Sequence, residues 1–360
     1  MLIGEAGSRK STAIKLMKNI VRETGYDNIA ADKTTKEKFL IDLQDGLYSD
    51  EAPDEVPWET ELYTTEPREV FITADEFNEF AGTGNIDFLS LLGTLWDYEG
   101  IFRARVKNSK SVAIYNPTVN ILAGNTSDRL VSAIPVEIIG QGFLSRIILV
   151  FGKRTEVRIP FPRTPDPEQK NRIIDLLQKI QINCRGEVSA ENTAKEMLSK
   201  IYRLWESLPD PRFSSYSTRR FTHLLKLCLV CCAARLGNSI EKEDVVFANT
   251  ILTYTENLMP RALGEFGKAK SSDVAHKIME ALDSTNEILS VIDLFRLVST
   301  DVDKISDLSN ILMNLEKAGK IQMAKTEKKQ GFLARRYSPV GVNTEFLDWN
   351  LLTSEELGYV

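Results

Sequence analysis

The sequence has few of the residues that build metal sites and disulfide frameworks. Its 360 residues include four cysteines and two histidines. Cys228 and Cys231 form a C-x-x-C pair, but no second pair stands at the spacing of a zinc site. We therefore expect the thiols to be small buried side chains in a reducing compartment.

Long apolar runs are also lacking. The longest candidate, residues 224–236, contains Lys226 and Arg235, which excludes it as a span of a bilayer. The first ten residues, MLIGEAGSRK, lack the charged-then-apolar layout of a signal peptide. Internal repeats and low-complexity blocks are missing as well. These absences predict a cytoplasmic protein with no membrane partner.

The composition that remains is ordinary for a globular protein, with 42% apolar and 27% charged residues. The length allows two or three domains, each with its own core. The net charge of −6 argues weakly against a nucleic-acid partner, but the charge is unevenly distributed. Residues 50–66 are strongly acidic, whereas residues 100–127 contain no acid and four cations, namely Arg103, Arg105, Lys107 and Lys110.

Hydrophobic spacing divides the chain into three parts. The first part is α/β: the spacing predicts helices over 11–25, 34–46 and 88–96, buried strands over 68–74, 118–125 and 145–152, and a β-hairpin over 101–116. From residue 167 to about residue 266 the pattern is entirely helical. Between residues 271 and 339, three helix-like stretches precede a basic pair of strands, which is the pattern of a winged helix.

The opening loop, GEAGSRKST, is close to the phosphate-binding motif G-x-x-x-x-G-K-[ST], with Arg9 in place of the second glycine. In such a loop, backbone N–H groups and a helix N-terminus surround the phosphates, a lysine reaches the β- and γ-oxygens, and a hydroxyl ligates Mg²⁺. Lys10 and Ser11 stand at the required offsets. The candidate residues for binding ATP are Gly4, Gly7, Ser8, Arg9, Lys10, Ser11 and Thr12, and Ser11 is also a candidate Mg²⁺ ligand.

Polar residues beside the later strands supply the rest of an ATPase site. Asp75 and Glu76 end the strand over 68–74, and an ATPase needs one carboxylate on Mg²⁺ and one that polarises the attacking water, at the tip of a strand next to the loop. Asn125 ends another strand and could orient that water. Arg146 precedes the last strand and could reach a phosphate across a subunit interface, as an arginine finger does. Each has a plainer interpretation as a solvated or turn residue, and their order favours the site.

Taken in order, these features resemble those of the AAA+ ATPases. More closely, they resemble the MCM-like helicases and the related ATPases of phage and mobile-element replication proteins. The stretches that carry the resemblance are GEAGSRKST, VFITADEFNEF, NPTVNILAGNTS and GQGFLSRIILVFG. A fifth stretch, residues 217–252, resembles the helical lid of that group and places Arg219 at its sensor-2 position, with Arg220 as the alternative. Loops of this branch often lack the glycine before the lysine, which makes Arg9 compatible with function.

The resemblance implies a domain plan and an activity. The plan is an α/β AAA+ core over 1–165 with an acidic insertion (49–67) and a pre-sensor hairpin (101–116), a helical lid over 166–268, a winged helix over 269–345 and a tail over 346–360. The implied activity is ATP hydrolysis with Mg²⁺ by a homo-hexameric ring that binds single-stranded or forked DNA, moves along the single strand and unwinds duplex in phage or mobile-element replication. The hairpin cations Arg103, Arg105, Lys107 and Lys110 are then candidate phosphate contacts.

Other interpretations stay open at this point. One is a non-translocating AAA+ initiator or helicase loader. Another is a DNA-binding winged-helix regulator with a degenerate ATPase fold. The winged helix could contact either DNA or other replication proteins. Only Met1, Leu2 and Ile3 precede the loop, whereas AAA+ proteins build part of the adenine pocket from residues further upstream, so the chain could be one piece of a larger protein.

Overall fold

The computed structural model divides the chain into two compact units, Met1–Gly264 with Asn343–Val360, and Glu265–Val342. The residues that it describes are 1–46, 67–96, 98–105, 111–133, 142–152, 161, 166–208, 210–264, 274–275, 277–279, 281–282, 288–299, 301–302, 304–317, 321–325, 330–334 and 346–352. The acidic insertion, apart from residue 67, and the hairpin residues Lys107 and Lys110 therefore lie outside the described residues.

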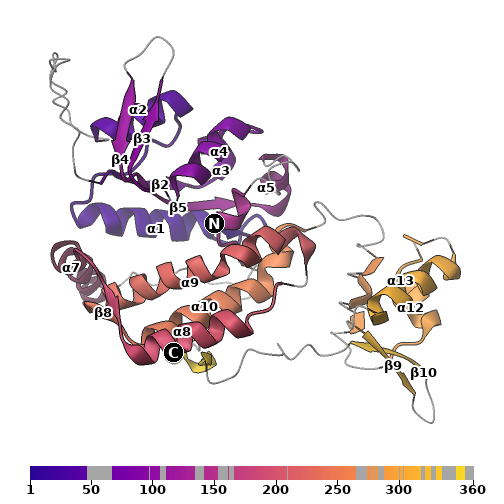
Figure 1. Ribbon diagram of the computed structural model, residues 1–360. Coiled ribbons are helices and arrows are strands. Elements are labelled where there is room, and N and C mark those ends of the chain that lie inside the picture. Colours follow the sequence, from indigo (N-terminus) through magenta and orange to yellow (C-terminus); the bar gives the residue numbers. More distant parts are fainter. Residues whose placement is uncertain are drawn as a thin grey trace. The chain divides into compact units, whose positions relative to one another are not determined.

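A parallel sheet of four strands forms the centre of the first unit (Figure 1). Its strands, in spatial order, are β2 (Glu69–Ala74), β5 (Thr118–Asn125), β1 (Leu2–Ile3) and β6 (Val150–Phe151). Beyond β2, Ile29 adds one parallel bridge to Phe71. The acid pair was expected on a strand next to the one that feeds the loop, but β5 lies between them. The protein is thus an α/β protein, and Asn125 stands between the loop and the acids.

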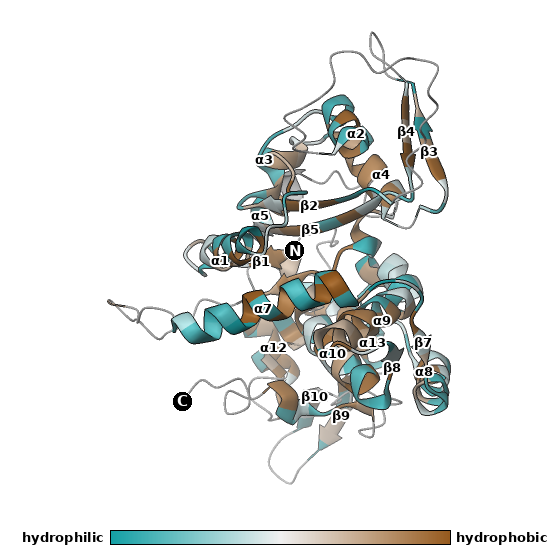
Figure 2. Ribbon diagram, turned by 90° about the vertical axis from the view of Figure 1, so that its left-hand side faces the viewer, coloured by the Kyte–Doolittle hydropathy of each residue, from teal (hydrophilic) through white to brown (hydrophobic). Residues whose placement is uncertain are grey.

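Helices cover both faces of this sheet (Figures 1 and 2). One face is covered by α1 (Lys10–Glu23), which buries Ile14 and Ile20. The other face is covered by α2 (Lys36–Asp45), α3 (Phe77–Ala81) and α4 (Ile86–Leu95). Phe39, Phe80 and Phe88 from these helices form edge and tilted ring contacts in the core. Strands β2 and β5 are mainly hydrophobic in Figure 2, as buried parallel strands require.

Local signals explain several helix ends. Thr35 caps α2 by accepting a hydrogen bond from the Lys38 backbone N–H, and Gly46 follows the helix with a φ of 82°. Gly25, with a φ of 83°, follows the C-cap of α1. Both helices therefore end close to the predicted bounds at residues 25 and 46. The short helices α3 and α5 (Ser127–Ala133) were not predicted.

The predicted hairpin is present as β3 (Ile101–Ala104) paired antiparallel with β4 (Val112–Tyr115). The predicted strand over 145–152 is much shorter than expected. Its first part is a 3₁₀ turn, η1 (Leu144–Arg146), and only Val150–Phe151 pair with β1, as β6. Arg146 therefore lies in a turn and not at the start of a strand.

The helical part of the first unit contains α7 (Pro167–Asn183), α8 (Asn192–Leu204), α9 (Ser214–Ala234) and α10 (Lys242–Ala262). It is not entirely helical, because the strands β7 (Ser189–Ala190) and β8 (Ser239–Ile240) form a short parallel pair and η2 (Pro211–Phe213) precedes α9. Helix α7 contacts α1, α9 contacts η1, and α10 contacts β6. Cys228 and Cys232 are buried and all four cysteines are free, and burial raises the pKa of Cys231 to about 11.

The described end of the predicted tail packs on the helical part. Phe346 is buried in the same core cluster as α8, α9 and α10, and the turn η4 (Trp349–Leu352) follows it. The Asn249 side chain donates a hydrogen bond to the Phe346 carbonyl at 3.0 Å. This segment is therefore part of the first unit although the second unit precedes it in the sequence.

The second unit has its own hydrophobic core around Ile278, Leu294 and Leu308. It contains helical residues between 274 and 282, the helices α12 (Val291–Leu297) and α13 (Ile305–Lys317), and an antiparallel hairpin of β9 (Ile321–Lys325) and β10 (Gln330–Ala334). Across the described residues of both units, no helix has the length and apolar character that crossing a membrane requires.

Candidate nucleotide site

The loop between β1 and α1 turns by means of two left-handed residues. Gly7 has a φ of 82°, which glycine adopts without strain. The Ser8 hydroxyl donates to the Glu5 carbonyl at 2.9 Å and closes the turn. Arg9 is the N-cap residue of α1 and has a φ of 61°. The position before Lys10 thus has the backbone conformation that favours glycine, although arginine occupies it.

Lys10 is folded back over the loop. Its ammonium group donates to the carbonyls of Gly4 and Glu5 at 2.8 and 2.9 Å and to the Ser8 hydroxyl at 3.1 Å. Desolvation by the surrounding loop lowers the pKa of this lysine. These are contacts that phosphate oxygens could replace, since the same three donors would then point to an anion instead of to neutral carbonyls. Ser11 and Thr12 follow in the first turn of α1.

Two glycines bring the loop, the helix and the strand ends close together. A Cβ on Gly4 would lie 2.3 Å from the Gly152 carbonyl oxygen. A Cβ on Gly124 would lie 2.7 Å from the Asp75 carbonyl oxygen and 3.6 Å from the Lys10 Cβ. The Gly4 backbone N–H donates to the Asn125 carbonyl at 3.3 Å. The predicted loop, acid pair and Asn125 therefore meet at one edge of the sheet.

Asp75 follows β2 and is partly exposed. Its carboxylate lies 3.2 Å from the Lys15 ammonium group, one helical turn beyond Ser11. Both side chains are exposed to solvent, so this ion pair is weak and exchangeable. A Mg²⁺ ion held by Asp75 and the Ser11 hydroxyl would replace the ammonium group as the cation beside the carboxylate.

A cavity of about 300 Å³ adjoins this carboxylate. Thr73, which is only 2% exposed, lines it, and the Thr73 hydroxyl has no hydrogen-bond partner among the residues that the structure describes. Buried polar atoms are rarely left unpaired, so this hydroxyl fits a site that a ligand or its water fills. A larger cavity, of about 490 Å³, contains none of the predicted site residues and is lined by Asn28, Leu43, Gly46, Pro67, Arg68, Glu69 and Arg185.

Glu76 and Asn125 are engaged by residues that the sequence did not single out. The Glu76 carboxylate forms an ion pair with Arg129 of α5. The Asn125 amide donates to the Asn78 side-chain oxygen at 2.7 Å, and the Asn78 amide donates to the Arg129 carbonyl at 2.8 Å. The signal for Asn78 was its position two residues after Glu76, and Arg129 stands four residues after Asn125. Together these contacts tie the two candidate water-positioning groups to one another.

Arg146 packs within its own chain. Its guanidinium donates to the Gly142 carbonyl at 2.8 Å and lies 6.0 Å from the Trp96 ring centroid. A Cβ on Gly142 would lie 2.7 Å from this guanidinium, so glycine makes room for it. Reaching a neighbouring subunit requires the side chain to leave the Gly142 carbonyl.

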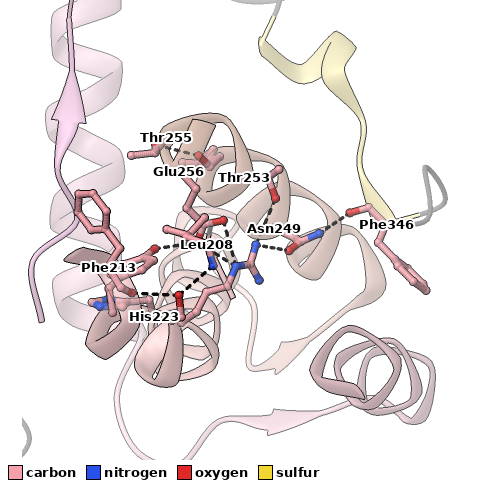
Figure 3. Close-up of polar contacts among 12 residues, drawn as sticks. Leu208, Phe213, His223, Asn249, Thr253, Thr255, Glu256 and Phe346 are labelled. Carbon is pink, nitrogen blue, oxygen red and sulfur yellow. Dashed lines mark hydrogen bonds and ion pairs between the residues drawn. The ribbon is translucent and has the colours of Figure 1, made fainter. Parts of the chain in front are cut away.

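The two candidates for the sensor-2 position differ sharply. Arg220 is only 2% exposed, and its guanidinium pairs with Glu256 at 2.9 Å, bonds to Asn249 and Thr253, and stacks 3.9 Å from the Trp205 ring centroid. In Figure 3, the side chains of Glu256, Asn249 and Thr253 extend from one helix into the same group of polar contacts. Arg219 makes no hydrogen bond or ion pair within the described part of the chain. Arg220 is therefore committed to the helical core, and Arg219 remains the candidate for the sensor-2 position.

The described hairpin cations lie apart from this site. Arg103 is exposed on β3, opposite Ala113 of β4, and Arg105 is exposed directly after the strand.

No protein-family model matches the sequence, and no curated protein matches it. The function is therefore inferred from the site itself.

Proposed function

We propose that the protein is an ATP-dependent motor of the AAA+ type, an MCM-like helicase or translocase that acts on DNA in replication of a phage or mobile element. The observation that carries this proposal is the meeting of Lys10, Asp75 and Asn125 at one sheet edge, through the close approaches at Gly4 and Gly124. A lysine at a helix N-terminus beside an acid pair fits phosphoryl chemistry better than any other use of those residues. The order of the motifs supports the same conclusion.

Each residue has a proposed role. Gly4 to Thr12 and Lys10 bind the phosphates of ATP, and Ser11 and Asp75 hold Mg²⁺, which supplies charge neutralisation at the β- and γ-oxygens. Glu76 accepts a proton from the attacking water, and Asn125 orients it. Arg219 binds the γ-phosphate from the helical lid, and Arg146 reaches the ATP of a neighbouring subunit. The last role implies a ring, which we propose to be a homo-hexamer in the cytoplasm.

DNA is the proposed polymer substrate. Arg103 and Arg105 of the hairpin provide exposed cations in a stretch, residues 100–127, that contains no acid, which suits sequence-independent contact with phosphates. The helices and hairpin of the second unit support a winged helix that binds DNA or another replication protein. Changing both Arg103 and Arg105 to alanine should make the affinity for single-stranded DNA less dependent on salt. The slope of log K against log salt concentration should fall by about 0.7 for each arginine that neutralises a phosphate.

A glutamate substitution tests the catalytic assignment. Glu76→Gln should lower ATP turnover by about 10²–10⁴-fold, because the amide cannot accept the proton, while binding of ATP persists. Glu37→Gln, which changes an exposed carboxylate in the first turn of α2, is the matched control and should leave turnover unchanged. Steady-state turnover of the Glu76 variant equal to that of the control would refute the assignment of Glu76 as the catalytic base.

A forked duplex separates the helicase from the initiator or loader. A helicase should displace the labelled strand only with ATP and Mg²⁺. The Glu76 variant should bind the fork but should not displace the labelled strand. ATP turnover without displacement by the assembled ring favours the non-translocating machine. Fork binding without any ATP turnover favours the winged-helix regulator.

A further inference from the structure

One face of helix α9 carries polar residues toward the α/β part of the unit. Arg219, His223 and Lys226 are spaced by four and three residues, which places them on the same side of a helix. His223 contacts the backbone of η1, and Lys226 contacts α4 at Trp96. Arg219 therefore lies about one helical turn before His223 and about two turns before Lys226. We call the contacts of these two residues the anchors, because they join α9 to the α/β part.

The first anchor is a buried hydrogen bond. His223 is 4% exposed, and its Nε2 lies 2.9 Å from the Ser145 carbonyl oxygen. A carbonyl oxygen accepts only, so Nε2 carries the proton and donates. Burial lowers the pKa of this histidine, which keeps the ring neutral near neutral pH. The ring stacks against Tyr216, at a centroid distance of 5.3 Å, and packs on Trp96 at 5.2 Å.

The second anchor is the contact of Lys226 with Trp96. The Lys226 ammonium group is 3.6 Å from the Trp96 ring centroid and donates to the Trp96 carbonyl at 3.1 Å. The Arg146 guanidinium packs near the same ring. His223 thus holds the residue immediately before Arg146, and Lys226 holds the aromatic ring that Arg146 packs near.

The adjoining side of α9 is fixed to α10. Arg220 and Tyr216 both bond to Glu256, and all three residues are buried (Figure 3). Such a satisfied polar network resists local rearrangement. A displacement of Arg219 would therefore move α9 and α10 together and act on η1 through His223, instead of being absorbed within the helical part.

We propose that His223 is a positioning residue that transmits the nucleotide state read by Arg219 to the placement of Arg146. The hydrogen bond to the Ser145 carbonyl is the link, because it joins the helix of one arginine to the turn of the other. In the ring, this link would couple the ATP site of one subunit to the position of the same subunit's Arg146, which would contact the ATP of the neighbouring subunit. The inference rests on the proposed function, since it uses the roles given there to Arg146 and Arg219.

Hydrogen exchange of the full-length chain with and without MgATPγS tests the link. Binding should protect amides of residues 4–12 and should change exchange at residues 143–147. In His223→Phe, which keeps an aromatic ring but removes the donor, the change at 143–147 should be lost while protection at 4–12 remains. In His223→Gln, whose side-chain amide still donates, the change at 143–147 should return. Arg219→Ala should also lose it, with His223 intact.

A matched control separates signalling from packing. Tyr216→Phe removes the hydroxyl bonded to Glu256 but keeps the ring that stacks on His223, so it perturbs the same core without touching the link to Ser145. It should keep the change at 143–147. The proposal is wrong if His223→Phe keeps that change, or if His223→Gln loses it as completely as His223→Phe does. It is also wrong if the wild-type chain protects residues 4–12 without a change at 143–147, a result that leaves nucleotide binding intact. Absence of protection at 4–12 refutes the nucleotide site itself.

Discussion

The edge of the α/β sheet and the core of the helical part both carry paired charges, but they hold them in opposite ways. At the sheet edge, Asp75 pairs with Lys15 and Glu76 with Arg129, and every one of these side chains is at least one-third exposed. In the helical core, Arg220 and Glu256 are each 2% exposed and are bonded further by Tyr216, Asn249 and Thr253. The first set can exchange partners at low cost, whereas the second cannot.

This contrast fits the proposed division of labour. Groups that must release one partner and accept a phosphate, a metal ion or a water are best held by screened, replaceable contacts. A helix that transmits a displacement is best held by a network with no spare partners. The exchangeable charges thus lie at the sheet edge, where we expect the ligand. The fixed pair of Arg220 and Glu256 joins α9, the helix that would sense the ligand, to α10.

The largest expected effect comes from breaking the fixed pair. Glu256→Ala leaves the Arg220 guanidinium buried without its carboxylate, which should cost about 3–5 kcal/mol of unfolding free energy. Urea denaturation followed by circular dichroism measures it. The matched control is Glu23→Ala, which removes the exposed partner of Lys170 and should cost at most about 1 kcal/mol. Equal losses for the two variants would remove the contrast between the regions.

A glycine at the sheet edge should give the next largest effect. Gly124→Ala adds a Cβ only 2.7 Å from the Asp75 carbonyl oxygen and 3.1 Å from Ile14 Cδ1. Relief of that clash would separate α1 from β2, so we expect a loss of about 1–3 kcal/mol in unfolding free energy and weaker ATP binding. Gly152→Ala is the control, because no described atom outside its chain neighbours lies within 4 Å of its added Cβ, and it should change stability by less than about 0.5 kcal/mol. A loss for Gly152→Ala as large as that for Gly124→Ala would show that the clash is not the cause.

The sequence predicted the residues at this edge better than it predicted their arrangement. The apolar runs before Asp75 and Asn125 marked strands that end in polar groups, and both strands are present. The order β2-β5-β1 was not predictable, because it depends on the pairing of strands that are distant in sequence. Likewise, the apolar run after Arg146 indicated a strand, but only two of its residues find a partner strand.

The angle between neighbouring side chains on a helix explains why Arg219 and Arg220 have different contacts. Arg219 and Arg220 are adjacent, and the resemblance to a lid helix placed Arg219 at the sensor-2 position but kept Arg220 as the alternative. In a helix they point about 100° apart, so one faces α10 and the other does not. Glu256, which decides between them, lies on another helix. The choice needed the tertiary structure, as did the roles of Asn78 and Arg129.

His223 lies where the two regions meet, so pH should probe the contact between them. Burial holds its pKa below the usual 6.5 in the folded state, against a smaller opposing contribution from the Ser145 carbonyl. The unfolded chain therefore binds more protons below pH 6.5, and stability should fall as the pH drops from there toward the folded pKa. The slope should not exceed about 1.4 kcal/mol per pH unit. Subtracting the profile of His223→Gln isolates this contribution from that of the carboxylates, and identical profiles would contradict it.

The smallest effect should come from the strained residue at the start of α1. Arg9 has a φ of 61°, and the same conformation occurs in the helical part at Leu236, with a φ of 58°. The left-handed conformation costs a side-chain-bearing residue about 1–2 kcal/mol, and glycine loses about 0.5–1 kcal/mol through greater freedom of the unfolded chain. Arg9→Gly and Leu236→Gly should therefore each raise the unfolding free energy by up to about 1 kcal/mol in urea denaturation. Only Arg9→Gly should also change the affinity for ATP, because only its backbone adjoins the lysine; a change in both variants, or in neither, would mean that the strain at Arg9 has no special relation to the nucleotide site.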